Sequence, residues 1–450
     1  MNQVRRFTYM SVLVLACLLV TACGSGDGED QADTGGEEEA AAEPVSLELW
    51  WWGDQEAAGA EGWMDETIEL FEADNAGVTI NAELQTTDGL IPAFKAAASA
   101  QEGPDIQYFW GGVWSVGDAW EGNIVPVSDY IDAEELDHYL NTEESTYEGQ
   151  IWTAPWYVNP SFPVLARTDV LSEHGLGVPE TWDQLLEACG VLSEAGVPTI
   201  AGGIKDGWFG GWLYSLVGSQ GVVLDDVFAA VLGEQSFTDP AHLAYWERLQ
   251  ELRDNDCFND DINSVELYQG QQQWSSGEAA MTIVAGSDVR KFLDEVDADV
   301  VEVLPMPVWG DGEYAGKLGS TSQTVGITSW SEHPEIAADF IVFMHTEERR
   351  QAWFEQTGAF PADDRFDPSV IDSRQLSSLF DMVVDGSPYI ENFIPPELDA
   401  DAIFSQSQLL LAGDVDAAEA AANTEEVAQR LRETRPDIVE NFGGWADSYR

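Results

Sequence analysis

The chain has 450 residues, of which 44% are apolar and 22% are charged, so it can bury a core and should hold two or three domains. Its 83 acidic residues against 18 Lys and Arg give a net charge of −65, which excludes nucleic acid as a partner, because binding phosphates needs a basic surface. So large a charge is tolerable where salt screens it, which predicts a saline habitat. An acidic composition shared by the whole lineage, without adaptive meaning, is the alternative.

Residues 1–22 have the pattern of a signal peptide. Arg5 and Arg6 precede an apolar run over 9–20, and small residues follow it. The run is too short for a helix that spans a membrane. We therefore expect residues 1–22 to be removed from the mature protein.

The signal peptide ends at a sequence that suits attachment of lipid. Val20-Thr-Ala-Cys23 resembles a bacterial lipobox, so we expect Cys23 to be acylated and to become the mature N-terminus. Cleavage by an ordinary signal peptidase, with Cys23 an incidental thiol, is the alternative. Residues 23–44 are acidic and lack large apolar side chains, which predicts a lipid anchor with a disordered tether. The folded part should then lie outside the bacterial cell membrane, held to it by lipid.

Strands and helices alternate after the tether. Apolar runs ended by Gly and Asp predict strands over 45–52, 78–84 and 105–110, and helical spacing predicts helices over 62–73 and 90–100. This order indicates a parallel sheet with right-handed crossovers. Ligands of such sheets bind beyond the carboxyl ends of the strands, and these ends are aromatic and hydrogen-bonding here.

A second segment of the same alternating kind begins at Trp156. Thr181 and Gln184 have the spacing of a capping box, which predicts the start of a helix. Further along we predict strands over 164–167, 198–201, 279–284 and 324–329, helices over 240–254, 270–278 and 334–344, and a mainly helical C-terminal third.

Two cysteines remain once the signal peptide is removed and Cys23 carries lipid. Cys189 and Cys257 are expected to form a disulfide, because a lone pair in an oxidising compartment is usually bonded. Two separately buried thiols are the alternative. The sequence has no CxxC motif and its five histidines are scattered, so we expect no zinc or other metal site.

Five short motifs occur in a characteristic order, and together they carry a family resemblance. The chain resembles the family 1 extracellular solute-binding proteins, the maltose-binding-like sugar receptors of ABC importers, over roughly residues 45–360. The motifs are Glu102-Gly-Pro-Asp-Ile106, Asn123-Ile-Val-Pro-Val-Ser-Asp129, Tyr147-Glu-Gly-Gln-Ile-Trp-Thr-Ala-Pro155, Val178-Pro-Glu-Thr-Trp-Asp183 and Gly277-Glu-Ala-Ala-Met281.

The resemblance implies an α/β protein with a periplasmic-binding-protein-like type II fold, in which two α/β lobes joined by crossing hinge strands close on a ligand. By analogy, lobe 1 holds 45–155 plus 306–360 and lobe 2 holds 156–305 plus 361–450, with hinge candidates at 304–307 and 358–361. The resemblance also implies a receptor, not an enzyme, that needs no cofactor, acts as a monomer and delivers a sugar to the ABC permease subunits in the membrane.

Tryptophan supplies the residue-level argument for a sugar. Trp outnumbers Tyr, 18 to 12, and several Trp lie in polar, Gly-rich settings. An indole face packs on the C–H patch of a pyranose, while amides and carboxylates bind its hydroxyls. A place in the core is the alternative for each candidate, and it explains Trp50 and Trp182 better. The candidates are Trp52, Trp110, Trp114, Trp156, and Trp208 and Trp212 in the loop Lys205-Asp-Gly-Trp-Phe-Gly-Gly-Trp212.

Three polar residues are candidates for the sugar hydroxyls. Asp54 follows the first strand. Asn159 lies where the resemblance to maltose-type receptors would place a carboxylate, and Asp288 lies where many relatives have a stacking tryptophan. These departures weaken the case for maltose but not for a sugar, since hydroxyls bond to either Asn or Asp.

Two other functions remain open at this point. A receptor for a polyamine, a peptide or another cation would also suit an acidic protein. A secreted glycosidase needs two placed carboxylates, and with 83 acidic residues their presence carries little information. The chain has no G-x-S-x-G, H-E-x-x-H or P-loop motif, so we predict that it is not an enzyme.

Overall fold

The computed structural model describes residues 44–53 and 57–449. The predicted signal peptide, Cys23, residues 24–43 of the tether and Asp54 lie outside these ranges. Among the described helices, none has the length and apolar character needed to cross a membrane.

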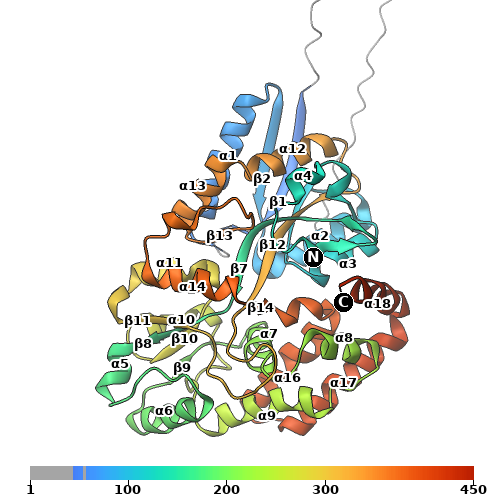
Figure 1. Cartoon of the computed structure of the whole chain (residues 1–450). Coiled ribbons are helices and arrows are strands. Elements are labelled where there is room, and N and C mark those ends of the chain that lie inside the picture. The colour runs from blue at the N-terminus through green and yellow to red at the C-terminus, as the bar shows by residue number, and fades with distance from the viewer. Residues whose placement is uncertain (1–43, 54–56, 450) are drawn as a thin grey trace, which may run out of the picture. The chain divides into compact units, whose positions relative to one another are not determined.

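An eight-stranded mixed sheet organises the first lobe (Figure 1). Its order is β13-β7-β12-β3-β1-β2, with β4 and β14 also pairing with β12. β1 runs parallel to β2 and β3, as predicted, whereas β12 is antiparallel to β3 and β7. The strands are β1 (Val45–Trp51), β2 (Val78–Leu84), β3 (Ile106–Phe109), β4 (Ile124–Val125), β7 (Ala154–Ser161), β12 (Gly319–Thr328), β13 (Phe360–Pro361) and β14 (Ser387–Pro388).

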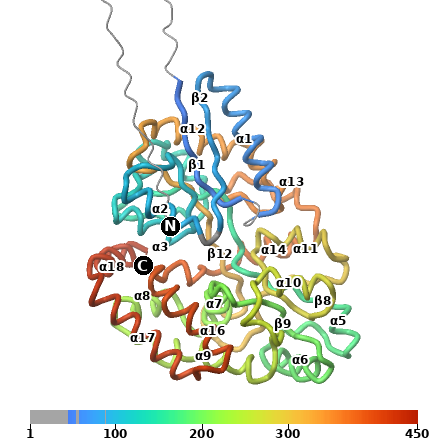
Figure 2. The backbone as a smooth tube through the Cα atoms, turned by 180° about the vertical axis from the view of Figure 1, so that it is seen from behind, coloured from blue at the N-terminus to red at the C-terminus, as the bar shows by residue number. Residues whose placement is uncertain are grey.

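Helices cover this sheet and bury its apolar side chains. In β1, Leu47, Leu49 and Trp51 alternate with more exposed residues and are almost fully buried, as expected for a strand with one face on a core. Figure 2 shows α1 and α13 side by side along this lobe. Its helices are α1 (Ala60–Asp74), α2 (Thr87–Ala100), α3 (Val113–Trp120), α4 (Ala133–Leu136), α12 (Pro334–Met344) and α13 (Glu347–Thr357), and a hairpin of β5 (Thr146–Tyr147) and β6 (Gln150–Ile151) adjoins them.

A four-stranded sheet of order β11-β8-β10-β9 forms the second lobe. β8 is antiparallel to β10 and β11, and β10 is parallel to β9. The predicted capping box of Thr181 and Gln184 begins α6. The elements are β8 (Val164–Arg167), β9 (Ile200–Ala201), β10 (Met281–Ile283), β11 (Val301–Leu304), α5 (Thr168–Glu173), α6 (Trp182–Ala195), α10 (Leu267–Ser275), α11 (Val289–Glu295) and α14 (Arg374–Val384).

A disulfide joins two helical segments of the second lobe. Cys189 lies in α6, and Cys257 follows α9. Their Cα atoms are 4.7 Å apart and both side chains are fully buried. The structure therefore pairs the two cysteines for which the sequence predicts a bridge.

A layer of helices completes the second lobe. α17 packs against α9 and α16, and α18 contacts α8 but also α3 and β5 of the first lobe. The C-terminal helix thus touches both lobes (Figure 2). The helices are α7 (Phe209–Leu213), α8 (Leu224–Leu232), α9 (Pro240–Asp254), α15 (Pro396–Leu398), α16 (Ser405–Ala412), α17 (Ala417–Thr434) and α18 (Pro436–Tyr449), with the short helices η3 (Tyr214–Gly218), η7 (Ile390–Phe393) and η8 (Asp399–Phe404) between them.

The chain enters the first lobe later than the expected boundary at 306. Residues 306–318 begin against the second lobe, where Val308 bridges to Thr181. The Trp309 indole also donates to the carbonyl of Val217 at 2.9 Å. The crossing into the large sheet is therefore made at the start of β12, at Gly319, and not at 304–307.

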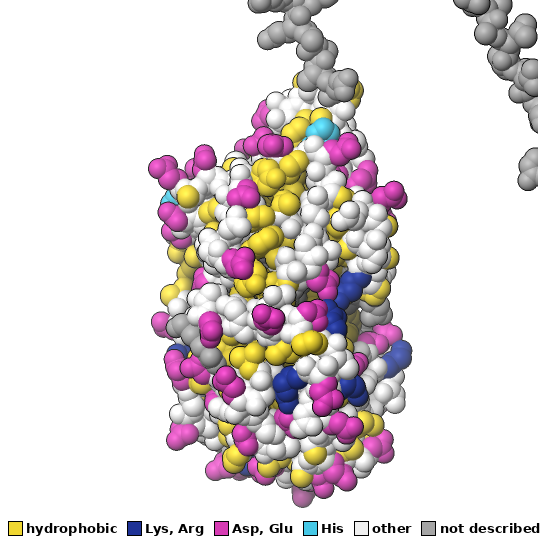
Figure 3. Space-filling model, turned by 90° about the vertical axis from the view of Figure 1, so that its right-hand side faces the viewer, with side chains coloured by type: hydrophobic (Ala, Val, Ile, Leu, Met, Phe, Trp, Pro, Cys, Tyr) yellow, Lys and Arg dark blue, Asp and Glu magenta, His cyan; other side chains and the backbone are white. Residues whose placement is uncertain are grey.

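Acidic side chains outnumber basic ones on the surface (Figure 3). Figure 3 shows Asp and Glu scattered over one face of the molecule with few Lys and Arg among them. With 83 acidic and 18 basic residues in the chain, most carboxylates have no cation to pair with.

Candidate functional site

A cavity of about 620 Å³ is lined by residues from both lobes. This volume lies within the range of roughly 300–1,000 Å³ that is common for small-molecule sites. Nine of its 22 lining residues are aromatic. Its rings belong to Trp52, Trp110 and Trp114 on one side and to Phe162, Trp208, Trp212, Tyr268, Tyr389 and Phe404 on the other.

The first group of indoles lies where β1 and β3 end. The ring of Trp52 meets Trp110 edge-on at 5.4 Å between centroids, and Trp110 meets Trp114 edge-on at 5.8 Å. Gly112, with φ of +65°, allows the turn between Trp110 and Trp114, because a side chain there would overlap the backbone of Asn392. The Gly-Gly turn thus places two indoles of the first lobe beside η7.

In the second group, Trp208 immediately precedes α7 and Trp212 lies on it. Trp208 and Trp212 are 5.1 Å apart between centroids, and Trp212 stacks on Phe162 at 3.7 Å. Phe162 has a φ of +61°, a strained value for a bulky residue, and such strain is frequent at functional sites. Gly211 is needed because a side chain there would overlap the Glu391 carboxyl. The glycines that the sequence shows between the two indoles therefore seat α7 against η7.

Polar groups enter the cavity from β7, β12 and η7. The Asn392 amide donates to the Thr321 hydroxyl at 2.6 Å, and that hydroxyl donates to Glu144 at 2.9 Å. Burial raises the pKa of the Glu144 carboxyl to about 8, although its hydrogen bond with Thr321 opposes the shift. Asn159 faces the same space, and its side-chain oxygen accepts from the amide of Ser287 at 3.4 Å.

One carboxyl of the cavity wall has a second, fully buried carboxyl beside it. Glu391 lines the cavity and is 7% exposed, and Asp399 is fully buried beside it. Burial raises the pKa of Glu391 well above its usual value, and the neighbouring Asp399 raises it further. Burial also raises the pKa of Asp399 to about 8.

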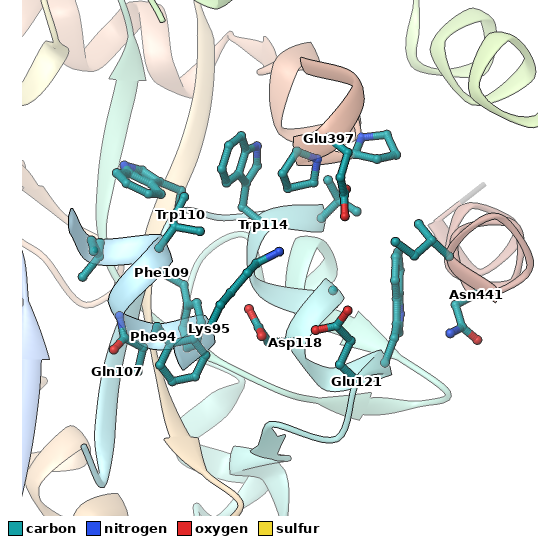
Figure 4. Close-up of a pocket in the computed structure, with 18 of the residues that line it drawn as sticks. Phe94, Lys95, Gln107, Phe109, Trp110, Trp114, Asp118, Glu121, Glu397 and Asn441 are labelled. Atoms are coloured by element: carbon teal, nitrogen blue, oxygen red, sulfur yellow. The ribbon is translucent and has the colours of Figure 1, made fainter. Parts of the chain in front are cut away.

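A second cavity of about 330 Å³ adjoins the first. The two share Lys95, Trp110, Trp114 and Glu397 among their lining residues. In Figure 4 the Lys95 side chain extends between Trp114 and Asp118. Trp114 thus belongs to the walls of both cavities.

Acidic groups of the second cavity are only partly neutralised. Burial raises the pKa of Asp118 to about 6, against a hydrogen bond from Asn123 that lowers it. Arg435 lies 3.4 Å from Glu121 and 3.6 Å from Glu397. This arginine therefore links Glu121, immediately after α3 of the first lobe, to α15 of the C-terminal helices.

The structure brings six of the nine candidate binding residues to the larger cavity. Trp156 is not among its lining residues: it is 3% exposed and packs on Trp63 and Trp353 at 5.4 and 4.9 Å between centroids. The pairing of β7 with β12 skips Trp156, because the register shifts between Tyr157 and Pro155, so this residue lies at a bulge. The residues that line the cavity are Trp52, Trp110, Trp114, Asn159, Trp208 and Trp212.

Asp288 is also placed away from the cavity lining. It is 2% exposed, immediately precedes α11, and lies 4.0 Å from the Lys291 ammonium. A carboxylate is stabilised at the N-terminus of a helix, which gives Asp288 a structural explanation. Asp54, the remaining candidate, lies outside the described residues.

Several lining residues were missed by the sequence analysis. Asp206 could have been predicted, because it belongs to the aromatic loop 205–212 that contains Trp208 and Trp212. No sequence signal marks Glu391, Asn392 and Phe404. They lie in the short helices η7 and η8, whose position depends on the whole fold. Lys95 lies on a helix, where its spacing is that of any exposed lysine.

Comparison with known proteins identifies relatives. The model of the bacterial extracellular solute-binding protein family matches residues 66–372. An uncharacterized ABC transporter extracellular-binding protein of Pyrococcus horikoshii is 22% identical over 292 residues, which is 63% of this chain and 66% of that protein.

Solved structures share the fold. A chitin oligosaccharide binding protein superposes with a TM-score of 0.78 at 21% identity, covering 87% of this chain and 99% of that one. The GacH receptor of Streptomyces glaucescens, solved unliganded and with acarbose, gives 0.72 at 18% identity over 87% and 99%. The maltose/maltodextrin-binding domain MalE from Bdellovibrio bacteriovorus, bound to maltotriose, gives 0.67 at 16% over 86% and 100%.

Proposed function

Because the chain belongs to the bacterial extracellular solute-binding protein family, whose members are receptors and not enzymes, we propose that it captures a sugar or an oligosaccharide between its lobes and delivers it to an ABC importer. The observation that carries this proposal is the larger cavity, where indoles of both lobes meet polar side chains. Aromatic rings cover the C–H faces of a sugar, and the amides of Asn159 and Asn392 reach its hydroxyls.

An oligosaccharide fits the site better than a single ring. Trp110 and Trp114 line both cavities, so the same indoles serve two neighbouring spaces. Relatives of the same fold are named for chitin oligosaccharides and maltotriose, which supports this class of ligand.

A receptor for a non-sugar cation, such as a polyamine or a peptide, is the second candidate. The larger cavity has three acidic lining residues, Asp206, Glu391 and Glu397, against one basic residue, Lys95. Aromatic rings also attract cations. The density of indoles on both sides favours the sugar.

A thermal-shift screen tests the proposal. A ligand that binds only the folded state raises its stability by RT ln(1 + [L]/Kd). At high salt, oligosaccharides should raise the melting temperature, whereas spermidine and short peptides should not. If spermidine raises the melting temperature and no saccharide does, the protein is a receptor for a cation and the sugar proposal is wrong.

The lipid anchor is proposed from Cys23 and the tether. The wild-type chain should sediment with membranes in cells, and the Cys23→Ala variant should be released, since stable anchoring needs more than one acyl chain and this residue would carry them. If Cys23→Ala remains in the membrane fraction, the anchor assignment is wrong.

A further inference from the structure

Three buried side chains form a hydrogen-bonded relay that ends at the wall of the larger cavity. The Asn392 amide donates to the Thr321 hydroxyl, and that hydroxyl donates to the Glu144 carboxyl, at 2.6 and 2.9 Å. Each of the three residues is at most 4% exposed. Thr321 and Asn392 line the cavity, whereas Glu144 is not among its lining residues. An effect of Glu144 on a bound ligand must therefore pass through the other two side chains.

The relay joins segments that are far apart in the sequence. Glu144 lies in the short helix η2 (Thr142–Ser145) of the first lobe, Thr321 lies in β12, and Asn392 lies in η7. Gly111 leaves room for two of the oxygens, because a side chain there would come 2.7 Å from Thr321 Oγ1 and 2.8 Å from Glu144 Oε2. The turn that follows β3 is thus shaped around the relay.

The acid at one end fixes the direction of both hydrogen bonds. A threonine hydroxyl has a single proton, and Thr321 gives its proton to Glu144. Thr321 can then only accept from Asn392, which holds the NH2 group of that amide against the hydroxyl. Turning the amide round would bring its oxygen against the Thr321 oxygen with no proton between them. Glu144 therefore determines which way round the Asn392 amide lies.

The oxygen of the Asn392 amide is the end of the relay that a ligand can reach. Among the residues that the structure describes, this oxygen accepts no hydrogen bond, and it is not one of the polar atoms that are enclosed away from solvent. Water or a donor group of a ligand must satisfy such an oxygen. On a saccharide that donor is a hydroxyl group.

We infer that Glu144 is a positioning residue, which acts through Thr321 to turn the Asn392 amide oxygen toward the ligand, where it accepts a hydrogen bond from a saccharide hydroxyl. This inference rests on the proposed sugar-binding function and adds the requirement for a hydroxyl donor at this wall. An ether oxygen or a fluorine in the same place has no proton to give, so it leaves the amide oxygen unpaired and loses affinity.

Calorimetric titration of Glu144 variants tests the role of the acid. The ligand is the oligosaccharide that gives the largest thermal shift, with maltotriose and chitotriose as the first probes. Burial raises the pKa of Glu144 to about 8, so at pH 9 the carboxylate can only accept and the relay has one direction. Glu144→Leu removes the acceptor and should weaken binding on the order of tenfold. Glu144→Gln, whose amide oxygen still accepts from Thr321, should recover most of this loss.

A double-mutant cycle shows whether Glu144 acts through Asn392. Asn392→Ala removes the amide that faces the ligand, so adding Glu144→Leu to it should cause no further loss of affinity. A general structural role of Glu144 would instead weaken binding by the same factor with and without the amide. If Glu144→Leu does not fold, Thr321→Val interrupts the same relay and takes its place in the cycle.

Glu143→Leu is the matched control for the substitution. Glu143 precedes Glu144 in η2 and is exposed, and it takes no part in the relay. The affinity of this variant should equal that of wild type.

Deoxyfluoro derivatives of the same oligosaccharide test the direction of the last hydrogen bond. At one ring position, fluorine in place of the hydroxyl should weaken binding to wild type on the order of tenfold, because fluorine cannot donate. The same derivative should bind to Asn392→Ala as well as the parent oligosaccharide does.

The outcomes separate this inference from the proposed function. If no oligosaccharide binds to wild type, the proposed function is wrong and this inference falls with it. Sugar binding stands and the positioning role is overturned if Glu144→Leu keeps the wild-type affinity, or weakens binding equally with and without the Asn392 amide. The hydroxyl donor is overturned if no fluorine substitution distinguishes wild type from Asn392→Ala.

Discussion

Trp110 and Trp156 differ in what surrounds their rings, and truncation distinguishes a binding role from a packing role. Trp110 lines both cavities, so Trp110→Ala should lose on the order of 2–4 kcal/mol of ligand affinity and leave folding nearly intact. Trp156 is buried among Trp63 and Trp353, so Trp156→Ala should cost about 3–5 kcal/mol of stability. Urea unfolding and titration of the best saccharide measure the two quantities.

The variants Trp110→Ala and Trp156→Ala act as controls for each other. Equal losses of stability in both variants would show that Trp110 is also a packing residue. Unchanged affinity in Trp110→Ala would remove the first-lobe indoles from the site.

Glu144 makes stability depend on pH. Its pKa is raised from 4.5 to about 8 in the folded state, so between these values the folded chain binds more protons than the unfolded chain. Stability due to this group is therefore present at low pH and falls as pH rises, by up to about 1.4 kcal/mol per pH unit. Glu144→Gln should flatten the decline between pH 5 and 8. The melting temperatures of wild type and Glu144→Gln should be measured across this pH range. If the two plots of melting temperature against pH run parallel, Glu144 is not the cause of the decline.

The site residues that could be predicted are those marked by residue type at a recognisable place in the chain. Trp52 and Trp110 follow strands with clear apolar patterns, and Trp208 lies in a Gly-rich loop. Trp156 is not among the residues that line the larger cavity, and its residue type alone could not predict where its side chain lies. Glu391 could not be found because one acidic residue among 83 carries no signal until the fold places it beside Asp399.

At the scale of elements, strongly periodic segments were predicted best. The bounds of β2, β8 and α12 agree with the expected ranges, because apolar repeats or a leading proline define them. β12 begins at Gly319, five positions before the expected start. Its first half, Gly-Ser-Thr-Ser-Gln, is polar because part of it faces the cavity, and it is extended because it pairs with β7.

The disulfide connects α6 to the end of α9, and its removal should loosen these elements together. The cysteines are 68 positions apart, and chain-entropy arguments give a stabilisation of roughly 4 kcal/mol as an upper estimate for such a loop. Cys189→Ser with Cys257→Ser should therefore melt earlier than wild type, with ligand affinity retained because neither residue lines either of the two cavities described above. Thiol titration of the unfolded, unreduced mature protein should detect no free cysteine in wild type; two reactive thiols would contradict the bridge.

At the scale of the whole molecule, repulsion between negative charges reduces the stability that packing of the core provides. The net charge is −65, and Asp and Glu side chains are scattered over the surface that Figure 3 presents. Repulsion among unpaired carboxylates favours the unfolded, expanded chain. Clusters in which an acid is paired with an arginine stabilise the folded chain instead. One such cluster is Asp363, fully buried, with Arg365, whose guanidinium also lies 2.5 Å from Glu135. Arg365 thus compensates an acid that is buried, whereas other arginines, such as Arg374 with Glu302, pair with exposed acids.

Stability should consequently rise with salt in a manner set by screening. The Debye length falls from about 30 Å at 0.01 M to about 3 Å at 1 M, so most of the repulsion between surface carboxylates is removed below roughly 0.5 M NaCl. The melting temperature should therefore climb steeply at first and then level off. A general salting-out effect on apolar burial would instead grow steadily with concentration and be stronger in sulfate than in chloride. Melting curves in NaCl and in Na2SO4 at matched ionic strength separate the two. A melting temperature indifferent to NaCl would show that the acidic composition has no stabilising relation to salt.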